Sequence, residues 1–239
     1  MGSRAERGAI GGFHDRPPAR SWLGLLAIGQ TPRDDLWPTL RAILGEDVHI
    51  RQAGGLDGLT WGAIEDLIAR EGEVPLETRL RSGRPIVVSR ERIIPYLVSA
   101  GRALQRQCGV VMLLCSGNFP VLTEACPGLI EPGRLLHSVV AALARNRRVG
   151  LIGPASDLER AAEVWQGDAP AFIAASASPY GDHERLLQAA AELAEGGAEL
   201  LVLDDMGFTM DHQDAVAATT GLPVLCATTL AARLLCEIL

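Results

Sequence analysis

Residues 110–118 read Val-Val-Met-Leu-Leu-Cys-Ser-Gly-Asn, so five apolar residues give way to four small or polar ones. An apolar run of this length, rich in branched side chains, is typical of a strand buried on both faces of a parallel sheet. The change at Cys115 marks the carboxyl end of that strand, where open α/β sheets bind their ligands. We therefore expect Cys115 and the turn after it to lie in a cleft.

Short apolar runs and helical patterns alternate on both sides of this stretch. Further strands are predicted at residues 23–28, 47–53, 85–89, 149–152, 171–175, 200–203 and 223–226. Helices are predicted at residues 32–43, 56–69, 91–107, 135–145, 158–165, 183–195, 213–219 and 228–237. Strands that alternate with helices form parallel sheets covered by helices on both faces. The sequence therefore predicts an α/β fold, and its two cycles of strands predict two lobes.

The two predicted lobes resemble each other at their strand ends. Residues 28–32 and 152–154 both run from a strand into Gly and then Pro. Residues 114–118 and 203–207 both run from an apolar strand into a polar turn. Ligands of open α/β sheets bind at such ends, so we expect the site to draw on both halves.

Composition and charge exclude several classes of partner. The chain has 239 residues, of which 48% are hydrophobic, and a formal net charge of −7. This is enough for one large domain or two small ones. No basic stripe is present, so we expect no nucleic-acid partner. The apolar runs are shorter than the roughly 18–20 residues that a membrane span needs, so we expect no membrane partner.

No motif for a metal or a cofactor occurs. The five cysteines and five histidines are scattered, without a CxxC pair, which argues against a disulfide framework and a metal site. Gly-rich phosphate loops are also missing, so we expect no cofactor. Residues 1–21 lack the apolar segment of a secretory signal and are predicted to be a flexible tail. Free thiols suit a reducing compartment, so we expect a cytoplasmic protein.

Cys115 is the first candidate for chemistry. It is followed by Ser116, Gly117 and Asn118, whose backbone N–H groups and side chains can hold a carboxylate where a helix begins. A helix start lowers the pKa of a nearby thiol, which favours a reactive thiolate. The alternative is a buried cysteine that packs as a small hydrophobic residue.

A pair of carboxylates, Asp204 and Asp205, ends another apolar strand and precedes Met206 and Gly207. Side chains alternate along a strand, so only one of the two can point into the cleft. We favour Asp205, whose pKa could be raised by desolvation until it acts as a base. The alternative is a pair of turn-forming residues that cap the next segment.

Other strand ends can add ligand-binding groups. Gly29 permits close approach of a ligand, and Arg33 can clamp a carboxylate with two hydrogen bonds. Solvent-facing charges at Arg33 and a structural turn at residues 153–154 remain the alternatives. The binding candidates at these positions are Gly29, Gln30, Thr31, Arg33, Ser89, Gly153 and Pro154.

Four segments together resemble the AroM family: residues 27–34, residues 88–90, the Cys115 turn with Asn118, and residues 203–208. The resemblance covers about residues 22–239 and extends to the aspartate/glutamate and hydantoin racemase superfamily. It implies two lobes related by a pseudo-twofold axis, each a mostly parallel sheet flanked by helices, with the site in the cleft between them.

The resemblance also implies the boundaries of the lobes. The first would hold residues 22–125 and about 215–239, because the final helix is expected to return to it. The second would hold residues 126–214. A homodimer is a further expectation from the superfamily.

In that superfamily, cofactor-independent racemases place one thiol on each side of the substrate's α-carbon. Cys115 matches the first thiol position, and Asp205 stands at the second, where AroM relatives often carry Cys. The resemblance thus implies a racemase or isomerase of a small carboxylate or amino-acid-like substrate, with Met206 and Gly207 in the site. The departure at Asp205 leaves two alternatives, namely a decarboxylase or lyase with one thiol and a non-catalytic carboxylate-binding regulatory protein.

Overall fold

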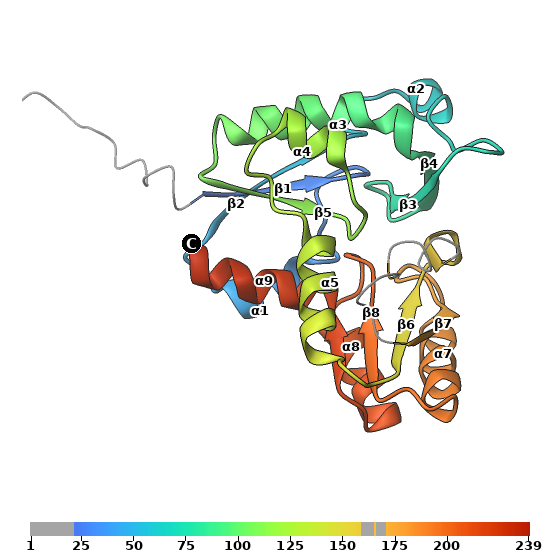
Figure 1. Ribbon diagram of the computed structural model, residues 1–239. Helices are drawn as coiled ribbons and strands as arrows, with labels where there is room; N and C mark the ends of the chain where they lie inside the picture. Colours follow the sequence, from blue (N-terminus) through green and yellow to red (C-terminus); the bar gives the residue numbers. More distant parts are fainter. Residues whose placement is uncertain (1–21, 159–164, 166–170) are drawn as a thin grey trace, which may run out of the picture.

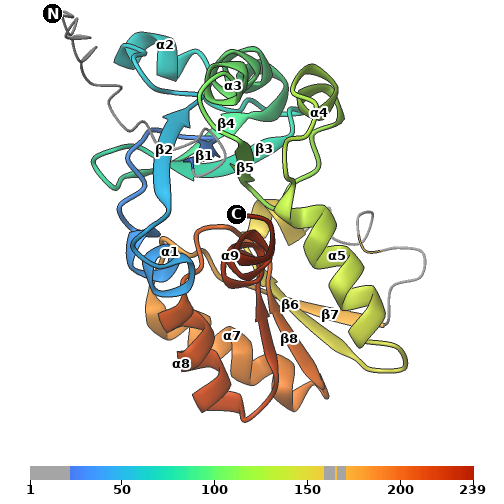
Figure 2. The ribbon, with the colours of Figure 1, turned by 90° about the vertical axis from the view of Figure 1, so that its left-hand side faces the viewer.

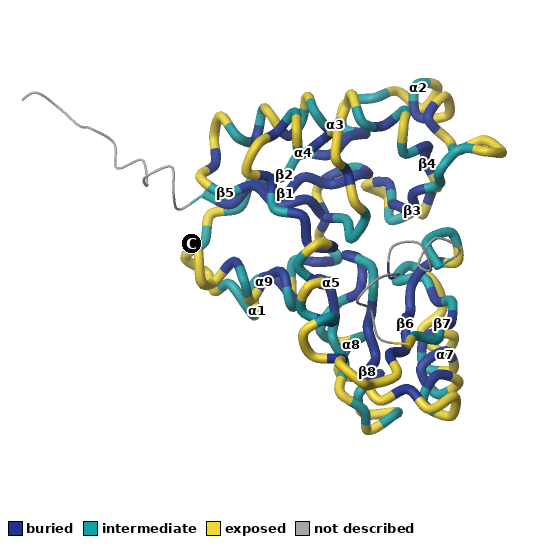
Figure 3. The backbone as a smooth tube through the Cα atoms, in the orientation of Figure 1, coloured by how far each residue is buried: buried dark blue, intermediate teal, exposed yellow. Residues whose placement is uncertain are grey.

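A computed structural model describes residues 22–158, 165 and 171–239 of the chain. The predicted tail at residues 1–21, and residues 159–164 of a predicted helix, lie outside this part. Figure 1 shows two α/β lobes, one above the other. The central strands of both are buried (Figure 3).

The first sheet has three parallel strands, with β1 (Trp22–Ala27) between β2 (His49–Gly54) and β5 (Val110–Leu114). Because side chains alternate along β1, Leu25 enters one apolar core and Leu26 the core on the opposite face. Helix α3 (Arg90–Gln105) covers the Leu26 face, with α4 (Pro120–Ala125) beside it. Helix α1 (Trp37–Leu44) lies on the other side, next to the last helix.

An antiparallel hairpin of β3 (Pro75–Arg79) and β4 (Pro85–Ser89) completes the first lobe. Strand β3 was not predicted, because its five residues mix polar and apolar types. The helix predicted at residues 56–69 is limited to α2 (Trp61–Glu65). The hairpin leaves no room at Gly29, where a Cβ atom would lie 2.2 Å from the carbonyl oxygen of Arg79. Gly29 therefore permits the approach of the hairpin backbone, and the ligand contact that we predicted there stays a prediction.

The helix predicted from Pro32 begins five residues later, at Trp37. The intervening residues form a turn, in which Arg33 N–H donates to Gln52 Oε1 (2.8 Å) and Leu36 N–H to the Arg33 carbonyl (3.2 Å). Pro38 takes the place in the first turn that Pro32 was expected to fill.

The second sheet is parallel throughout, in the order β7 (Phe172–Ser176), β6 (Val149–Gly153), β8 (Leu200–Leu203), β9 (Val224–Cys226). Helices α7 (His183–Glu195) and α8 (Met210–Thr220) pack on each other at one face of this sheet. Strands β6, β7 and β8 repeat the arrangement of β1, β2 and β5, with the first strand of each cycle in the centre. The two lobes therefore have the pseudo-twofold relation that the resemblance implied.

Helix α9 (Ala227–Ile238) lies against α1 and α5 (Pro132–Leu143), as Figure 2 shows. Its buried residues join one apolar core with both sheets, including Leu25 of β1 and Leu151 of β6. Residues 215–239, which we expected in the first lobe, thus contain β9 of the second sheet and then helix α9, which contacts α1. The lobe boundaries stay a prediction. In the described part of the chain, no helix is long and apolar enough to cross a membrane.

Candidate active site

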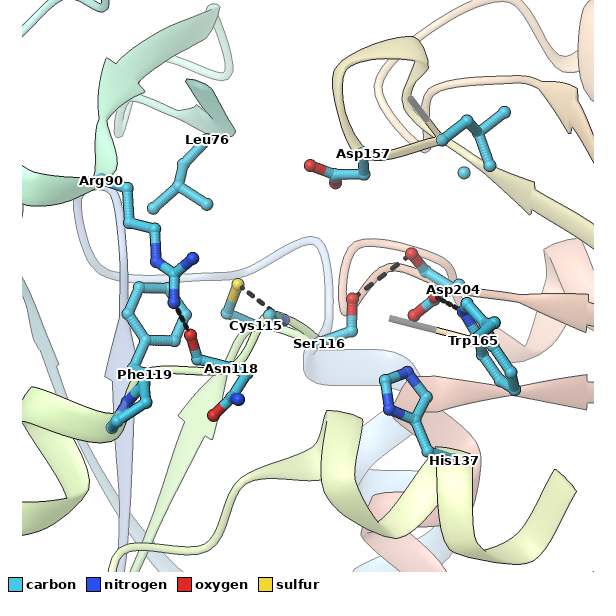
Figure 4. A pocket seen from close by; sticks show the side chains of 14 residues that line it. Leu76, Arg90, Cys115, Ser116, Asn118, Phe119, His137, Asp157, Trp165 and Asp204 are labelled. Atoms are coloured by element: carbon cyan, nitrogen blue, oxygen red, sulfur yellow. Dashed lines mark hydrogen bonds between the residues drawn. The ribbon is translucent and has the colours of Figure 1, made fainter. Parts of the chain in front are cut away.

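A cavity of about 200 Å³ lies between the lobes, at the carboxyl ends of β5, β6 and β8 (Figure 4). Both lobes contribute to its wall. The described residues that line it are Leu76, Arg90, Cys115, Ser116, Gly117, Asn118, Phe119, Pro120, His137, Gly153, Asp157, Leu158, Trp165 and Asp204. Five of the predicted site residues are thus brought together here: Cys115, Ser116, Gly117, Asn118 and Gly153.

Cys115 directly follows β5, and its thiol lies between the groups of the two lobes (Figure 4). Burial raises the pKa of this thiol, and the charges of Asp205 and Asp157 raise it further. The Gly117 N–H, which donates to Cys115 Sγ at 3.4 Å, opposes the rise. The lowered pKa that we predicted is therefore wrong, because burial outweighs the Gly117 N–H and α4 starts only at Pro120. The thiol is neutral at neutral pH.

The turn after Cys115 is held from two directions. Helix α5 approaches it so closely that a Cβ atom at Gly133 would lie 1.8 Å from the Ser116 carbonyl oxygen. From the second lobe, the Asp204 carbonyl accepts a hydrogen bond from Ser116 Oγ at 3.3 Å. The turn is thus positioned by both lobes before any ligand arrives.

Arg90 supplies a guanidinium to the cavity. It is the first residue of α3, directly after β4, and lies over the Phe119 ring at 5.0 Å. Its Nη2 donates to the Asn118 carbonyl. We predicted Ser89 here instead, but Ser89 is fully buried, is not among the lining residues, and donates through Oγ to Glu91 (3.4 Å).

Asp204, the carboxylate that we did not favour, lines the cavity. Its Oδ2 accepts from Trp165 Nε1 at 3.3 Å. Burial raises the pKa of this carboxyl, which His137 and the neighbouring Ser116 and Trp165 oppose. His137, on α5, packs edge-on against the Trp165 ring with centroids 4.3 Å apart. Burial lowers the pKa of His137, and the charge of Asp204 opposes this.

Asp205 is not among the described lining residues. Its Oδ1 accepts the Gly207 N–H at 2.5 Å. Burial raises the pKa of this carboxyl to about 8, and the charge of Asp157 contributes, while Gly207 and Arg33 oppose the rise. Of the three aspartates near the thiol, Asp205 nevertheless has the largest electrostatic effect on Cys115. It lies beside the cavity rather than in its wall.

Comparison with known proteins shows the family of this chain. The AroM protein family matches residues 23–239, which is nearly all of the described chain. The chain belongs to the AroM family. No curated protein matches it.

Solved structures with the same two-lobed fold belong to the Asp/Glu racemase superfamily. Arylmalonate decarboxylase is 18% identical, with a TM-score of 0.54 over 87% of this chain and 88% of that chain. Glutamate racemase from Francisella tularensis in complex with D-glutamate is 14% identical, with a TM-score of 0.57 over 92% and 81%. Maleate isomerase from Pseudomonas putida S16 with maleate is 12% identical, with a TM-score of 0.53 over 87% and 88%.

The remaining predicted residues of this AroM-family chain lie around the cavity rather than in it. Arg33 is buried and forms an ion pair with Asp35 (2.7 Å). It also donates a hydrogen bond to the Tyr180 hydroxyl of the second lobe (3.2 Å). Gln30 accepts the Arg81 N–H (3.0 Å) and holds the β3–β4 hairpin. The Thr31 hydroxyl donates to Asp57, and the Pro154 carbonyl accepts the Asp157 N–H. Met206 lies in the apolar core that both sheets share, and Gly207 lies beside Tyr180.

The available groups limit the chemistry of this AroM-family site. Among the described residues, no group of three or more His, Cys, Asp or Glu side chains is arranged to hold a metal ion. All 22 basic residues of the chain are Arg, so no lysine is available to form a Schiff base. Among the described lining residues, the cavity offers the neutral Cys115 thiol, the Asp204 carboxyl with its raised pKa, the Asp157 carboxyl and the Arg90 guanidinium.

Proposed function

We propose that this chain is a cofactor-independent enzyme of the isomerase or racemase type, which moves a proton at the α-carbon of a small carboxylate. Cys115 acts as one acid/base and Asp205 as the opposing one. The observation that carries the proposal is the Cys115 thiol in a cavity between the lobes, next to carboxyls at the end of β8. The AroM match and the racemase, isomerase and decarboxylase fold of its structural neighbours support it.

The protonation states of Cys115 and Asp205 suit a two-sided transfer. Asp205, with a pKa of about 8, is the stronger acid of the two, and the Cys115 thiol keeps its proton. The reactive form is therefore the Asp205 carboxylate with the Cys115 thiol. Asp205 takes the α-proton and Cys115 donates its own to the other face, which leaves a carboxylic acid and a thiolate. The reverse reaction, or exchange with water, restores the first state.

Asp205 must turn toward the cavity to act in this way, since its carboxyl accepts a hydrogen bond from the Gly207 N–H. The charge that Asp205 already exerts on Cys115 supports this role over one at Asp157 or Asp204. A rotation of one side chain is a small movement compared with closure of a lobe.

The substrate carboxylate has donors on the first lobe. Arg90 and Asn118 lie on one side of the thiol, and Ser116 lies on its other side, toward Asp204 (Figure 4). Donors that are fixed before the reaction stabilise the charge of an enolate, which is usually the largest catalytic effect. The bond from Arg90 to the Asn118 carbonyl keeps the guanidinium at this turn.

A decarboxylase or lyase is the second candidate, and the raised pKa of Cys115 favours it. Such an enzyme needs a single neutral thiol, which protonates the enediolate that remains after the carbon–carbon bond breaks. It needs no opposing base, so it would tolerate Asp205 in place of a second thiol.

Product analysis in deuterated water separates the candidates. An isomerase or racemase leaves deuterium at the α-carbon of a product that keeps all its carbon. A lyase releases carbon dioxide and leaves deuterium on the shortened acid. Binding without either product, over a broad panel of acids, would instead support a carboxylate-binding regulatory protein. A cytoplasmic location and a homodimer stay predictions, which cell fractionation and light scattering would test.

A further inference from the structure

The two oxygens of the Asp204 carboxyl differ in their hydrogen bonding to the described residues. Oδ2 accepts from Trp165 Nε1, whereas Oδ1 is buried and has no hydrogen-bond partner among the described residues. Buried polar atoms in native proteins nearly always have partners, because an unpaired one costs free energy. Asp204 lines the cavity, so a ligand there can supply the missing donor.

The charges around the cavity show what kind of donor fits. Figure 4 shows Arg90 and Asn118 on one side of the Cys115 thiol, and Asp157 and Asp204 on the other. A complementary ligand places its negative group toward Arg90 and a positive one toward Asp204. A dicarboxylate would bring a second negative charge toward the Asp204 carboxyl, which is unfavourable in a partly desolvated site.

His137 does not supply the missing donor. Its imidazole packs edge-on against the Trp165 ring, and Asp204 Oδ1 has no hydrogen-bond partner among the described residues. The rest of the wall is largely apolar, with Leu76, Phe119 and Leu158 among its residues. A ligand of this cavity therefore combines a carboxylate, a cationic donor and a small apolar substituent.

Building on the proposed function, we propose that Asp204 binds the α-ammonium group of the substrate, and that the substrates are neutral α-amino acids with small apolar side chains. The carboxylate lies at Arg90 and the Ser116–Asn118 turn. The ammonium donates to Asp204 Oδ1, and the α-carbon lies over the Cys115 thiol. Asp204 is then a residue that determines specificity, separate from the proton-transferring pair.

Calorimetric titration of the full chain with three matched probes tests this assignment. The probes are leucine, 4-methylpentanoate and isobutylmalonate, which share one side chain and differ by an ammonium, a hydrogen or a second carboxylate. The valine and phenylalanine sets extend the panel, with both enantiomers of each amino acid. We expect the amino acid to bind about 10- to 100-fold tighter than its deamino acid, as for a hydrogen bond to a charged group.

Asp204→Asn should remove most of this preference and leave the affinity for 4-methylpentanoate unchanged. Asp214→Asn, at an exposed position on α8, is the matched control and should keep the preference. Thermal unfolding of each variant shows whether it is folded, and the comparison of probes on the unaltered chain does not depend on any variant.

Equal or tighter binding of the deamino acid or the malonate would overturn the assignment, and so would failure of every amino acid in the panel to bind. An equal loss for all probes in Asp204→Asn would also overturn it. The proposed function is read separately, as α-deuteration of the bound amino acid. Binding with the expected preference but without deuteration would refute the catalytic proposal and keep the ligand assignment.

Discussion

Ser116 Oγ donates a hydrogen bond to the Asp204 carbonyl at 3.3 Å, and so joins the end of β5 to the end of β8. The two residues belong to different lobes and both line the cavity. This bond sets the spacing between the Cys115 turn and the aspartates, on which any chemistry between them depends.

Ser116→Ala should loosen this contact. A typical hydrogen bond contributes about 0.5–1.5 kcal/mol, so we expect the free energy of unfolding to fall by about that amount. The turnover rate should also fall, by a larger factor than this loss of stability alone would cause, because the turn loses its hydrogen bond to the second lobe. Denaturant unfolding and the rate of α-proton exchange check the two effects. Ser138→Ala, on the exposed side of α5, should change neither by more than about 0.5 kcal/mol.

Gly133→Ala should distort the site through packing alone. The new Cβ would lie 1.8 Å from the Ser116 carbonyl oxygen, so α5 or the turn must shift. Overpacking of this kind costs about 1–3 kcal/mol. Gly62→Ala is the matched control, because its Cβ would meet nothing within 4 Å. Unfolding curves that match for the two variants would show that the close approach is not real.

The Asp205 carboxyl should make stability depend on pH. Its pKa rises from 3.8 in the unfolded chain to about 8 in the folded protein, so the folded state holds the proton more tightly. This contribution is fully present below about pH 3.8 and is lost as the pH rises through about 8. Asp205→Asn should therefore be more stable than the unaltered chain at pH 8.5, by on the order of 5 kcal/mol. Urea unfolding at pH 5.5 and 8.5 checks this. A stability difference between Asp205→Asn and the unaltered chain that is smaller at pH 8.5 than at pH 5.5 would refute it.

The same carboxyl should also shape the activity. If Asp205 must be ionised to accept the α-proton, the exchange rate should rise as the pH approaches about 8 and then level off. Asp205→Asn should lose this rise together with most of the activity. A rate that falls over the same range would instead favour the thiol donor of a lyase.

Cys115 should react slowly with iodoacetamide at neutral pH. Burial and the nearby carboxylates raise the pKa of its thiol, and only the thiolate is alkylated. Exposed Cys236 serves as the internal reference in peptide mass spectrometry. We expect Cys236 to be labelled first and Cys115 to lag at least about tenfold. Faster labelling of Cys115 would show that the thiol is activated after all.

Much of the fold could be predicted because it depends on long apolar runs. The run at residues 110–114 is a buried strand in any α/β arrangement, and the polar turn after it marked Cys115 as part of the site. Strand β3 could not be found in this way, because Pro75–Arg79 is short and half polar and is stabilised by its pairing with β4. Local pattern is a weak guide where tertiary pairing decides the structure.

The site was harder to predict than the fold, because it depends on where strands end. Alternation required that one of Asp204 and Asp205 face the cleft, but the sequence does not show which, since β8 ends at Leu203 and the direction of the next side chain is free. Arg90 directly follows the candidate Ser89 but was not among the predicted binding residues, because a surface position was favoured for it; the β3–β4 hairpin brings the start of α3 to the cavity. His137 and Trp165 come from helical patterns that carry no signal of their own.

The account rests on proton transfer by the Cys115 thiol, and inversion at the α-carbon measures this directly. Chiral chromatography and proton NMR in deuterated water should show that the unaltered chain converts one enantiomer of a bound acid into the α-deuterated opposite enantiomer. Cys115→Ala should lower the rate of this inversion about 100- to 10,000-fold and still bind the acid, while Asp205 can still exchange the α-proton on its own face. Inversion at an unchanged rate in Cys115→Ala would contradict the central claim.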